Sequence, residues 1–202
     1  FGLCRVSCMN AIRQYVKNIT SVSTQKSVNE VRYHMHLAWQ RLANNISPWR
    51  VKVRNRLQQM NGVWLHWGCG RRRLDGWINI DGWKSDATDY VHDLRTKLPF
   101  SDNAVELIFS EHVLEHVEFS VAENVLADFF RILQPGGKVR LVVPDLDKCC
   151  QAYLNRDKAW FSVVDAARVT AGDGLNHIFY SHFHRYIYDY ETLALVLQKA
   201  GF

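Results

Sequence analysis

Residues 63–81 read VWLHWGCGRRRLDGWINID and carry the clearest signal of the fold. A short apolar run ends at the G-x-G of Gly68 and Gly70, and Asp81 closes a second apolar run eleven positions after Gly70. In an open parallel sheet, ligands bind at the carboxyl ends of the strands, where glycines allow close backbone approach and an acid can accept ribose hydroxyls. Alone this signal is weak, because a G-x-G in an α/β core is often only a turn.

The residues after the glycines exclude a P-loop, since no G-K-[ST] follows them. They also disfavour a dinucleotide site, because Arg71-Arg72-Arg73 stands where the third glycine of that fingerprint is expected. Eleven positions between Gly70 and Asp81 are too few for a full helix, so RRRLDG is predicted to be a turn or a short helix.

The chain has 202 residues, of which 48% are hydrophobic and 22% charged, as in an ordinary globular protein. No apolar run approaches the roughly 20 residues that a transmembrane helix needs. The cysteines are odd in number and form no CxxC pair, which favours free thiols over a disulfide framework or a zinc site; they are Cys4, Cys8, Cys69, Cys149 and Cys150. Free thiols predict a reducing compartment, the cytoplasm.

The positive charge is concentrated at the start of the chain. Residues 1–62 hold ten Lys or Arg and one acidic residue, a net charge of +9. Residues 63–202 hold fifteen Lys or Arg and nineteen acidic residues, a net charge of −4, so that the whole chain has a net charge of +5. A basic region of this kind can contact an anionic membrane surface or an acidic protein, or can be a solvated helix face. We do not expect a nucleic-acid partner, since the acidic body lacks an RNA-binding motif.

The periodicity predicts two organisational parts, a basic helical region over 1–62 and an α/β domain over 63–202. Apolar residues at three-to-four spacing predict a helix over 27–46, and Ser47-Pro48 starts another that stops before Asn61-Gly62. Further on, short β-type runs alternate with helical runs, which predicts a three-layer, doubly wound and mostly parallel sheet. The predicted strands are 63–67, 76–81, 89–94, 104–110 and 136–145, and the predicted helices of this part are 121–133 and 189–202.

Across residues 64–147 the chain resembles the class I S-adenosylmethionine-dependent methyltransferases, which have a Rossmann-like fold. The resemblance rests on LHWGCG, GWINIDGW, HDLRTKLPFSDNAVELIFSEHVLEH and FRILQPGGKVRLVVPDL, with FHRYIYDYETLALVLQKAGF beyond them. The most similar subgroup is that of small bacterial enzymes often associated with polysaccharide and cell-surface glycan gene sets. In this fold a sixth and a seventh strand normally follow the helix that ends at Gly201-Phe202, so we expect a longer parent chain.

The resemblance implies S-adenosylmethionine as the cofactor and assigns its binding residues. Gly68, Cys69 and Gly70 would lie under the methionine part, next to His66 and Trp67 at the end of the first strand. Asp81 would bind the ribose hydroxyls, Asp93 with the Leu94 backbone the adenine edge, and Ser110-Glu111 would border the sulfonium. The acid that family members often carry two positions before the first glycine is His66 here, read either as a subgroup variant or as a sign of impaired binding.

Histidines are the candidates for a general base, which methyl transfer needs only when the acceptor is a poor nucleophile such as a sugar hydroxyl. His184, which lies among aromatic residues (Tyr180, Phe183, Tyr186) ahead of the last helix, ranks first as base or acceptor-binding residue, and His112 ranks second. His112 and His116 are four apart, but their order with Glu111 and Glu115 is not the H-E-x-x-H of a zincin, so no metal is expected. Cys149-Cys150 is interpreted as packing.

The expected reaction is methyl transfer from S-adenosylmethionine to an oxygen or nitrogen of a small polar acceptor, preferably a sugar or glycan. The alternative is a non-catalytic scaffold or cofactor-binding protein that retains the fold. The methyl acceptor and the oligomeric state are beyond the sequence.

Overall fold

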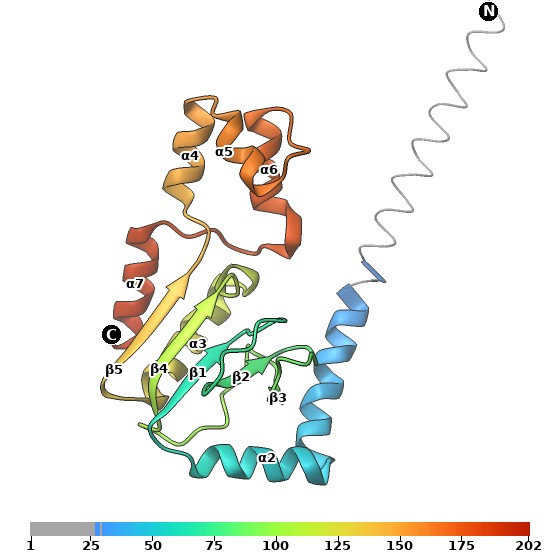
Figure 1. Ribbon diagram of the computed structural model, residues 1–202, viewed down its shortest axis with the longest axis vertical. Coiled ribbons are helices and arrows are strands. Elements are labelled where there is room, and N and C mark those ends of the chain that lie inside the picture. The colour runs from blue at the N-terminus through green and yellow to red at the C-terminus, as the bar shows by residue number, and fades with distance from the viewer. Residues whose placement is uncertain (1–26, 29) are drawn as a thin grey trace, which may run out of the picture. The chain divides into compact units, whose positions relative to one another are not determined.

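The computed structural model describes residues 27, 28 and 30–202, without the side chain of His182. Residues 30–46 are helical, in agreement with the predicted helix over 27–46. The chain divides into two compact units between Ala43 and Asn44, and the second unit, up to Phe202, contains the sheet (Figure 1). No helix among the described residues combines the length and apolarity that crossing a membrane would need.

The second unit is built on a five-stranded parallel sheet with the order β3-β2-β1-β4-β5. Its strands are β1 Val63–Trp67, β2 Ile78–Asp81, β3 Tyr90–Val91, β4 Val105–Glu111 and β5 Leu133–Val142. The strand order reverses between β1 and β4, which pair in register through Leu65↔Ile108 and His66↔Phe109. A reversal of this kind opens a crevice at the carboxyl ends of the two strands, so the sheet confirms the predicted Rossmann-like fold and locates its ligand edge.

One face of the sheet is covered by α3 (Phe119–Ile132) and α7 (Tyr190–Ala200). The apolar stripe of α3 buries Val125, Phe129 and Ile132, and the Phe129 ring meets Trp67 of β1 edge-on at a centroid distance of 5.1 Å. Each large side chain buried in this way stabilises the fold by roughly 1.5–3 kcal/mol. Trp67 is therefore part of the core, fully removed from solvent.

The opposite face of the sheet has a different character. His66 and Phe109 lie on it, with ring centroids 5.3 Å apart, and the half-exposed Trp64 ring packs against Trp77 of the turn before β2. Arg140 of β5 places its guanidinium 5.8 Å from the Phe109 centroid. No helix forms between β1 and β2, as predicted, so the 71–77 turn lies on this face instead.

Helix α2 (Pro48–Gln59) begins with Pro48 in its first turn, as predicted, and buries Leu57 in the main core. Its Gln58 carbonyl accepts a hydrogen bond of 2.7 Å from Ser101 Oγ, shortly before β4 begins. The helix therefore lies at the amino ends of the strands, away from the ligand edge (Figure 1).

The fifth strand differs from its prediction. It begins at Leu133 rather than at Gly136, because Leu133 already pairs with Val105 of β4. The pairing then shifts, and Leu107 meets Lys138. The QPGG sequence is thus an irregularity inside the strand, with Gly136 at a φ of +79°, instead of a turn that precedes it.

A helical segment that the sequence analysis did not predict follows β5. We call it the cap; it consists of α4 (Leu146–Leu154), α5 (Lys158–Val164), α6 (Ala171–Tyr180) and the 3-10 turn η2 (Ser181–Phe183). Its three α-helices begin after the N-cap residues Asp145, Asp157 and Thr170, whose side chains accept hydrogen bonds from backbone amides. The cap has its own small apolar core, centred on Phe161, and lies beyond the carboxyl ends of β4 and β5 (Figure 1).

Candidate active site at the carboxyl edge of the sheet

The loop after β1 brings backbone close to the turn that follows β4. Gly68 has a φ of +77°, and a Cβ built on it would lie 2.2 Å from Cγ2 of Val113, so this position requires glycine. The amides of Gly68 and Cys69 donate to the Ile80 carbonyl of β2 at 2.8 and 3.1 Å. The loop is thus fixed between the end of β2 and the turn after β4.

Asp81 lies at the end of β2, where the sequence predicts a ribose-binding acid. It is 9% exposed; its Oδ2 accepts from the Gly70 amide and its Oδ1 from the Trp83 amide, both at 2.8 Å. An ionised carboxylate offers about four lone-pair sites, so each oxygen can still accept a hydroxyl. The geometry therefore fits the predicted role, with the carboxylate oriented in advance by the glycine loop.

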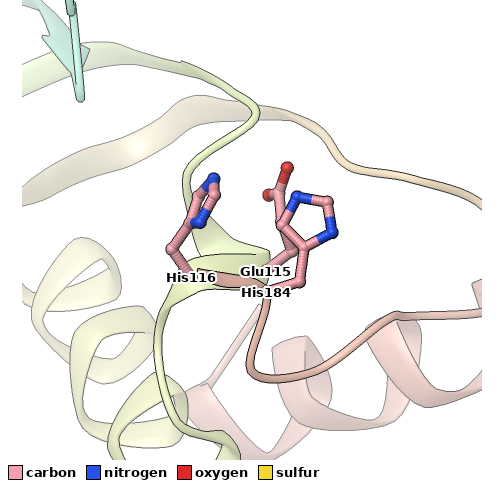
Figure 2. Close-up of side chains that lie close together, drawn as sticks. All are labelled: Glu115, His116 and His184. Atoms are coloured by element: carbon pink, nitrogen blue, oxygen red, sulfur yellow. The ribbon is translucent and has the colours of Figure 1, made fainter. Parts of the chain in front are cut away.

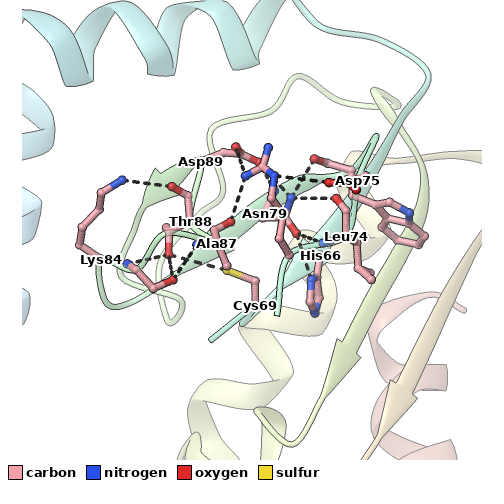
Figure 3. Close-up of polar contacts among 12 residues, drawn as sticks. His66, Cys69, Leu74, Asp75, Asn79, Lys84, Ala87, Thr88 and Asp89 are labelled. Atoms are coloured by element: carbon pink, nitrogen blue, oxygen red, sulfur yellow. Dashed lines mark hydrogen bonds and ion pairs between the residues drawn. The ribbon is translucent and has the colours of Figure 1, made fainter. Parts of the chain in front are cut away.

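His66 belongs to a polar network beneath this loop (Figure 3). Its Nδ1 lies 3.1 Å from Oδ1 of Asn79, which also accepts from the Leu74 amide at 3.0 Å. The Asn79 amide group donates to the carbonyls of Leu74 and Trp77 and to Asp89. Burial lowers the pKa of His66, so the imidazole is neutral in this network.

The same network explains where two of the three arginines go. Arg73 binds Asp89 at 2.8 Å; burial on its own would raise the pKa of Asp89, but hydrogen bonds from Asn79 and Arg73 outweigh it and lower the pKa. Arg72 reaches across to Glu111 at the end of β4, with an N–O distance of 2.7 Å. Arg72 and Arg73 therefore tie the glycine loop to the end of β4 and to the residue before β3.

Cys69 and Trp67 enter the site only through their backbones. The Cys69 thiol is buried 3.8 Å from Oγ1 of Thr88, and burial raises its pKa. The Trp67 side chain lies in the core against Phe129. Either residue can therefore face a cofactor with main-chain groups alone.

The remaining predicted cofactor residues lie at the ends of β3 and β4. Asp93 is buried, and its Oδ1 accepts from both the amide and the Nε of Arg95 at 3.2 Å, while Leu94 packs partly buried against the core. Ser110 is buried at the end of β4, next to the Glu111 that pairs with Arg72. The predicted cofactor residues thus gather at one edge of the sheet.

A pocket of about 730 Å³ lies between the end of β4 and the cap. Both predicted catalytic histidines, His112 and His184, line it, although 72 positions separate them in the chain. The remaining lining comes from the turn after β4, the segment that leads into α4, and the helices α4, α5, α6 and η2: Glu115, His116, Pro144, Asp145, Lys148, Cys149, Trp160, Val164, His177, Ile178 and Phe183.

His112 is held by a fully buried carboxylate. It has a φ of +54°, a side chain that is 62% exposed, and an Nδ1 that lies 3.2 Å from Oε1 of Glu115. A carboxylate oxygen accepts, so Nδ1 carries the proton and Nε2 keeps its lone pair. This is the tautomer that a general base needs.

His184 is oriented by the cap. Its Nδ1 lies 2.5 Å from the carbonyl of Ile178 in α6, so this nitrogen donates and Nε2 keeps the lone pair. Its ring meets that of His116 edge-on, with centroids 4.9 Å apart (Figure 2). His116 and His184 thus lie next to Glu115 at the wall of the pocket.

The aromatic residues near His184 divide among three environments. Phe183 lines the pocket, Tyr180 is 80% exposed, and Tyr186 packs against Phe119 in the main core with a centroid distance of 4.6 Å. Of the predicted acceptor wall, the structure therefore brings only Phe183 to the pocket.

Sequence reasoning missed Glu115, Lys148 and Trp160 as pocket residues. The signal that could have found the cap is the T-x-x-D pattern of Thr170 and Asp173, a helix start in which Oγ1 of Thr170 accepts from the Asp173 amide at 3.1 Å. Cys149 is buried in the cap core, and burial raises its pKa to about 11, in keeping with its interpretation as packing.

Comparisons with known proteins bear on the sheet and its edge. Residues 75–141, about a third of the chain, match the family model of a methyltransferase domain. A search of curated proteins gives no match. Among solved structures, a SAM-dependent methyltransferase from Archaeoglobus fulgidus is 14% identical with a TM-score of 0.45, covering 80% of this chain and 72% of its own.

Two further structures are similar at the same level. One is phosphoethanolamine N-methyltransferase 2 of Haemonchus contortus in complex with S-adenosyl-L-methionine, at 15% identity and a TM-score of 0.41, over 83% of this chain and 40% of its own. The other is a chain of the Haloferax volcanii complex that contains the Trm112 methyltransferase activator, at 15% identity and a TM-score of 0.45, over 81% and 72%.

The family match spans β2, β3, β4, α3 and most of β5, which are the elements that place Asp81, Asp93 and Ser110 at one edge. The strand order of the sheet is that of a Rossmann-like fold. Residues 75–141 are therefore similar to a methyltransferase domain, within a sheet that has the strand order of a Rossmann-like fold.

Proposed function

We propose that the chain transfers a methyl group to an oxygen or nitrogen atom of a small polar acceptor, with a sugar or glycan as the preferred class. The observation that carries the proposal is the histidine-lined pocket of about 730 Å³, which begins at His112, directly after the strand end that would border the cofactor. Most of a small polar molecule would be enclosed in a pocket of this size.

The cofactor would be held by the carboxyl edge of the sheet. The backbone of Gly68, Cys69 and Gly70 would contact its methionine part, next to His66 and Trp67, and Asp81 would accept the ribose hydroxyls. Asp93 and the Leu94 backbone would bind the adenine, and Ser110-Glu111 would border the sulfonium. The bound group supplies an activated methyl on a positively charged sulfur, so the protein's task is to align the acceptor with it and to exclude water.

His112 is the residue that we expect to take the proton of an acceptor hydroxyl. Its Nε2 keeps the lone pair that accepts the proton, and the Glu115 carboxylate next to Nδ1 orients the ring. His184 ranks first from the sequence, but its anchor is the neutral Ile178 carbonyl, so we assign it to acceptor binding instead. General bases of this kind contribute about 10²–10⁴-fold to rate.

Lys148 adds a preference within the acceptor class. It lines the pocket from the first turn of α4, with its Nζ 3.6 Å from Asp145 and its side chain 71% exposed. An ammonium group at a pocket entrance favours polar or anionic substituents on the acceptor. We also propose that the protein works in the cytoplasm, the reducing compartment predicted from the cysteines. The basic region 1–62 would contact a membrane surface or an acidic protein.

The test begins with isothermal titration of S-adenosylmethionine and S-adenosylhomocysteine. We expect micromolar binding that weakens at least about 100-fold in Asp81→Ala, because the variant removes a buried acceptor of two hydroxyls. Asp86→Asn changes an exposed acid five positions further on and should bind like the parent protein. No binding at millimolar cofactor by the parent protein would overturn the enzyme assignment and favour the scaffold alternative.

The acceptor is then identified by methyl transfer from isotope-labelled S-adenosylmethionine to a panel of sugars and amino compounds. With an active hydroxyl acceptor, His112→Asn should lower kcat about 10²–10⁴-fold with little change in cofactor affinity. His34→Asn, which alters an exposed histidine outside the domain, should leave both values unchanged. A His112→Asn variant with full activity would remove His112 from the mechanism.

A further inference from the structure

Glu115, His116 and His184 form a compact group of metal-type ligands at the wall of the pocket. One ligand atom from each residue can be chosen so that all lie within 4.8 Å of one another. Figure 2 shows the carboxylate and the two rings side by side, with Glu115 and His116 from the η1 turn (Leu114–His116) and His184 from the segment after the cap. Nothing in the proposed methyl transfer requires His116, and nothing requires the second oxygen of Glu115.

Backbone hydrogen bonds hold the two segments together. The amides of Arg185 and Tyr186 both donate to the carbonyl oxygen of Glu115, at 2.7 and 3.2 Å. Because His184 directly precedes Arg185, this clamp fixes its Cα next to the η1 turn. The group is therefore a product of the fold and does not depend on the placement of flexible surface side chains.

The protonation pattern of His184 is the one that metal-binding histidines show. Its Nδ1–H donates to the Ile178 carbonyl, which leaves Nε2 with its lone pair. Metal-ligating histidines almost always donate their other nitrogen to a carbonyl or a carboxylate in this way, which orients the ring and raises the basicity of the ligand atom.

Glu115 supplies the independent observation that points to a ligand. The residue is fully buried, and its Oε1 is paired with His112, but its Oε2 has no hydrogen-bond partner among the described residues. A buried carboxylate oxygen without a partner is costly, and a cation next to it removes that cost. The two nearby imidazoles define what kind of cation would fit.

We propose that Glu115, His116 and His184 bind one divalent transition-metal ion, with zinc as the preferred ion. Two imidazole nitrogens and one carboxylate oxygen suit zinc, iron or cobalt better than the oxygen-preferring Mg²⁺ or Ca²⁺. Zinc ligands at about 2.0–2.2 Å from the metal lie ~3.4 Å apart, so modest side-chain rotations close the present separations. This replaces the sequence-based expectation of no metal, which considered His112 and His116 alone.

Three protein ligands leave a fourth coordination position, as in zinc sites that take part in catalysis. Since the three residues line the pocket, that position opens toward the acceptor. An acceptor hydroxyl bound there would lose its proton more readily, with His112 on the other oxygen of the same carboxylate. The metal would thus select acceptors that offer an oxygen ligand.

The experiment titrates zinc into metal-free protein by calorimetry, without cofactor or acceptor, so that its outcome is independent of the proposed methyl transfer. The protein carries Cys4→Ser and Cys8→Ser, which remove thiols that lie outside the described residues. We expect one zinc per chain, with a Kd at least about 100-fold weaker in Glu115→Gln and in His184→Asn, since even second-shell losses cost 10–100-fold. Cobalt titration should give the visible absorption of a nitrogen- and oxygen-ligated site.

His177→Asn is the matched control, because His177 lines the same pocket but binds Ser181 and Asp165 instead. It should keep the parent affinity for zinc. Circular dichroism establishes that each variant is folded, and zinc should raise the melting temperature of the parent protein but not that of Glu115→Gln. Absence of stoichiometric binding by the parent, or equal binding by all variants, would overturn the proposal.

Discussion

The two ends of the crevice satisfy their polar groups in opposite ways. At the glycine loop, the side-chain oxygens of Asn79 and Asp81 already accept hydrogen bonds from backbone amides, which fix their orientation. At the pocket, the fully buried Glu115 leaves one oxygen without a hydrogen-bond partner among the described residues, and its other oxygen lies next to Nδ1 of His112. We call the glycine-loop end the frame, because hydrogen bonds within the protein already fix its polar side chains. At the pocket, a bound ligand would supply the missing partners.

In the frame, the largest loss of stability and of cofactor binding is expected where a side chain lies closest to the backbone. Gly68→Ala places a Cβ 2.2 Å from Val113 Cγ2 and a side chain at positive φ, so we expect a loss of about 3 kcal/mol of unfolding free energy and of cofactor binding. Gly70→Ala is the control, with a similar φ of +55° but open space around it, and should cost about 1 kcal/mol. Urea unfolding measures the stability of both variants. Equal losses would show that the positive φ, and not the contact with Val113, causes the destabilisation.

The polar network should show the next largest effect. Asn79→Ala removes the acceptor of the Leu74 amide and the donor to Leu74, Trp77 and Asp89, and should lower the unfolding free energy by about 2–3 kcal/mol. Asn176→Ala, at an exposed position of α6, should change it by less than about 0.5 kcal/mol. If both variants melted alike, the loop would not depend on the network.

Acid should weaken the frame through its buried histidines. Burial lowers the pKa of both His66 and His92 below the ordinary value of 6.5, so the unfolded state binds more protons as the pH falls below that value. Their contribution to stability is therefore present above about pH 6.5 and lost on acidification. The urea midpoint should fall between pH 7 and pH 5, and by less in His66→Gln; an unchanged slope in the variant would contradict the assignment.

The smallest expected effect is a difference between the two thiols of the cap in their rate of alkylation. Burial raises the pKa of Cys149 to about 11, whereas its neighbour Cys150 is exposed. At pH 8, iodoacetamide should therefore modify Cys150 well before Cys149, as peptide mass spectrometry of timed samples can follow. Equal rates would mean that the cap core opens readily and is less well packed than Phe161 and Ile178 suggest.

The sequence predicted the frame because its signals are local. The strands β1 and β4 follow from short apolar runs, and the G-x-G and Asp81 lie within one stretch of nineteen residues. The predicted start of β5 was wrong, because Leu133 already pairs with Val105 of β4. This is a tertiary contact that a local sequence pattern does not indicate.

The pocket was predicted only in part, for a physical reason. The histidines stood out as residue types, but their meeting depends on the hydrogen bonds from Arg185 and Tyr186 to the Glu115 carbonyl, across about 70 positions. The helices α4, α5 and α6 have only nine, seven and ten residues, too few for a clear apolar period. Which residues hold the cofactor and perform the chemistry remains a prediction.

The bridge between Asp145 and Tyr188 has a consequence for how such enzymes diversify. It joins the point where the chain leaves the sheet for the cap to the point where it returns, and the Leu146 amide donates to the Tyr188 carbonyl at 2.9 Å. Since exit and entry are adjacent, the intervening segment is an exchangeable cassette with its own apolar core. Replacement of this segment would therefore leave the pairings of the five-stranded sheet intact while it altered one wall of the proposed acceptor pocket.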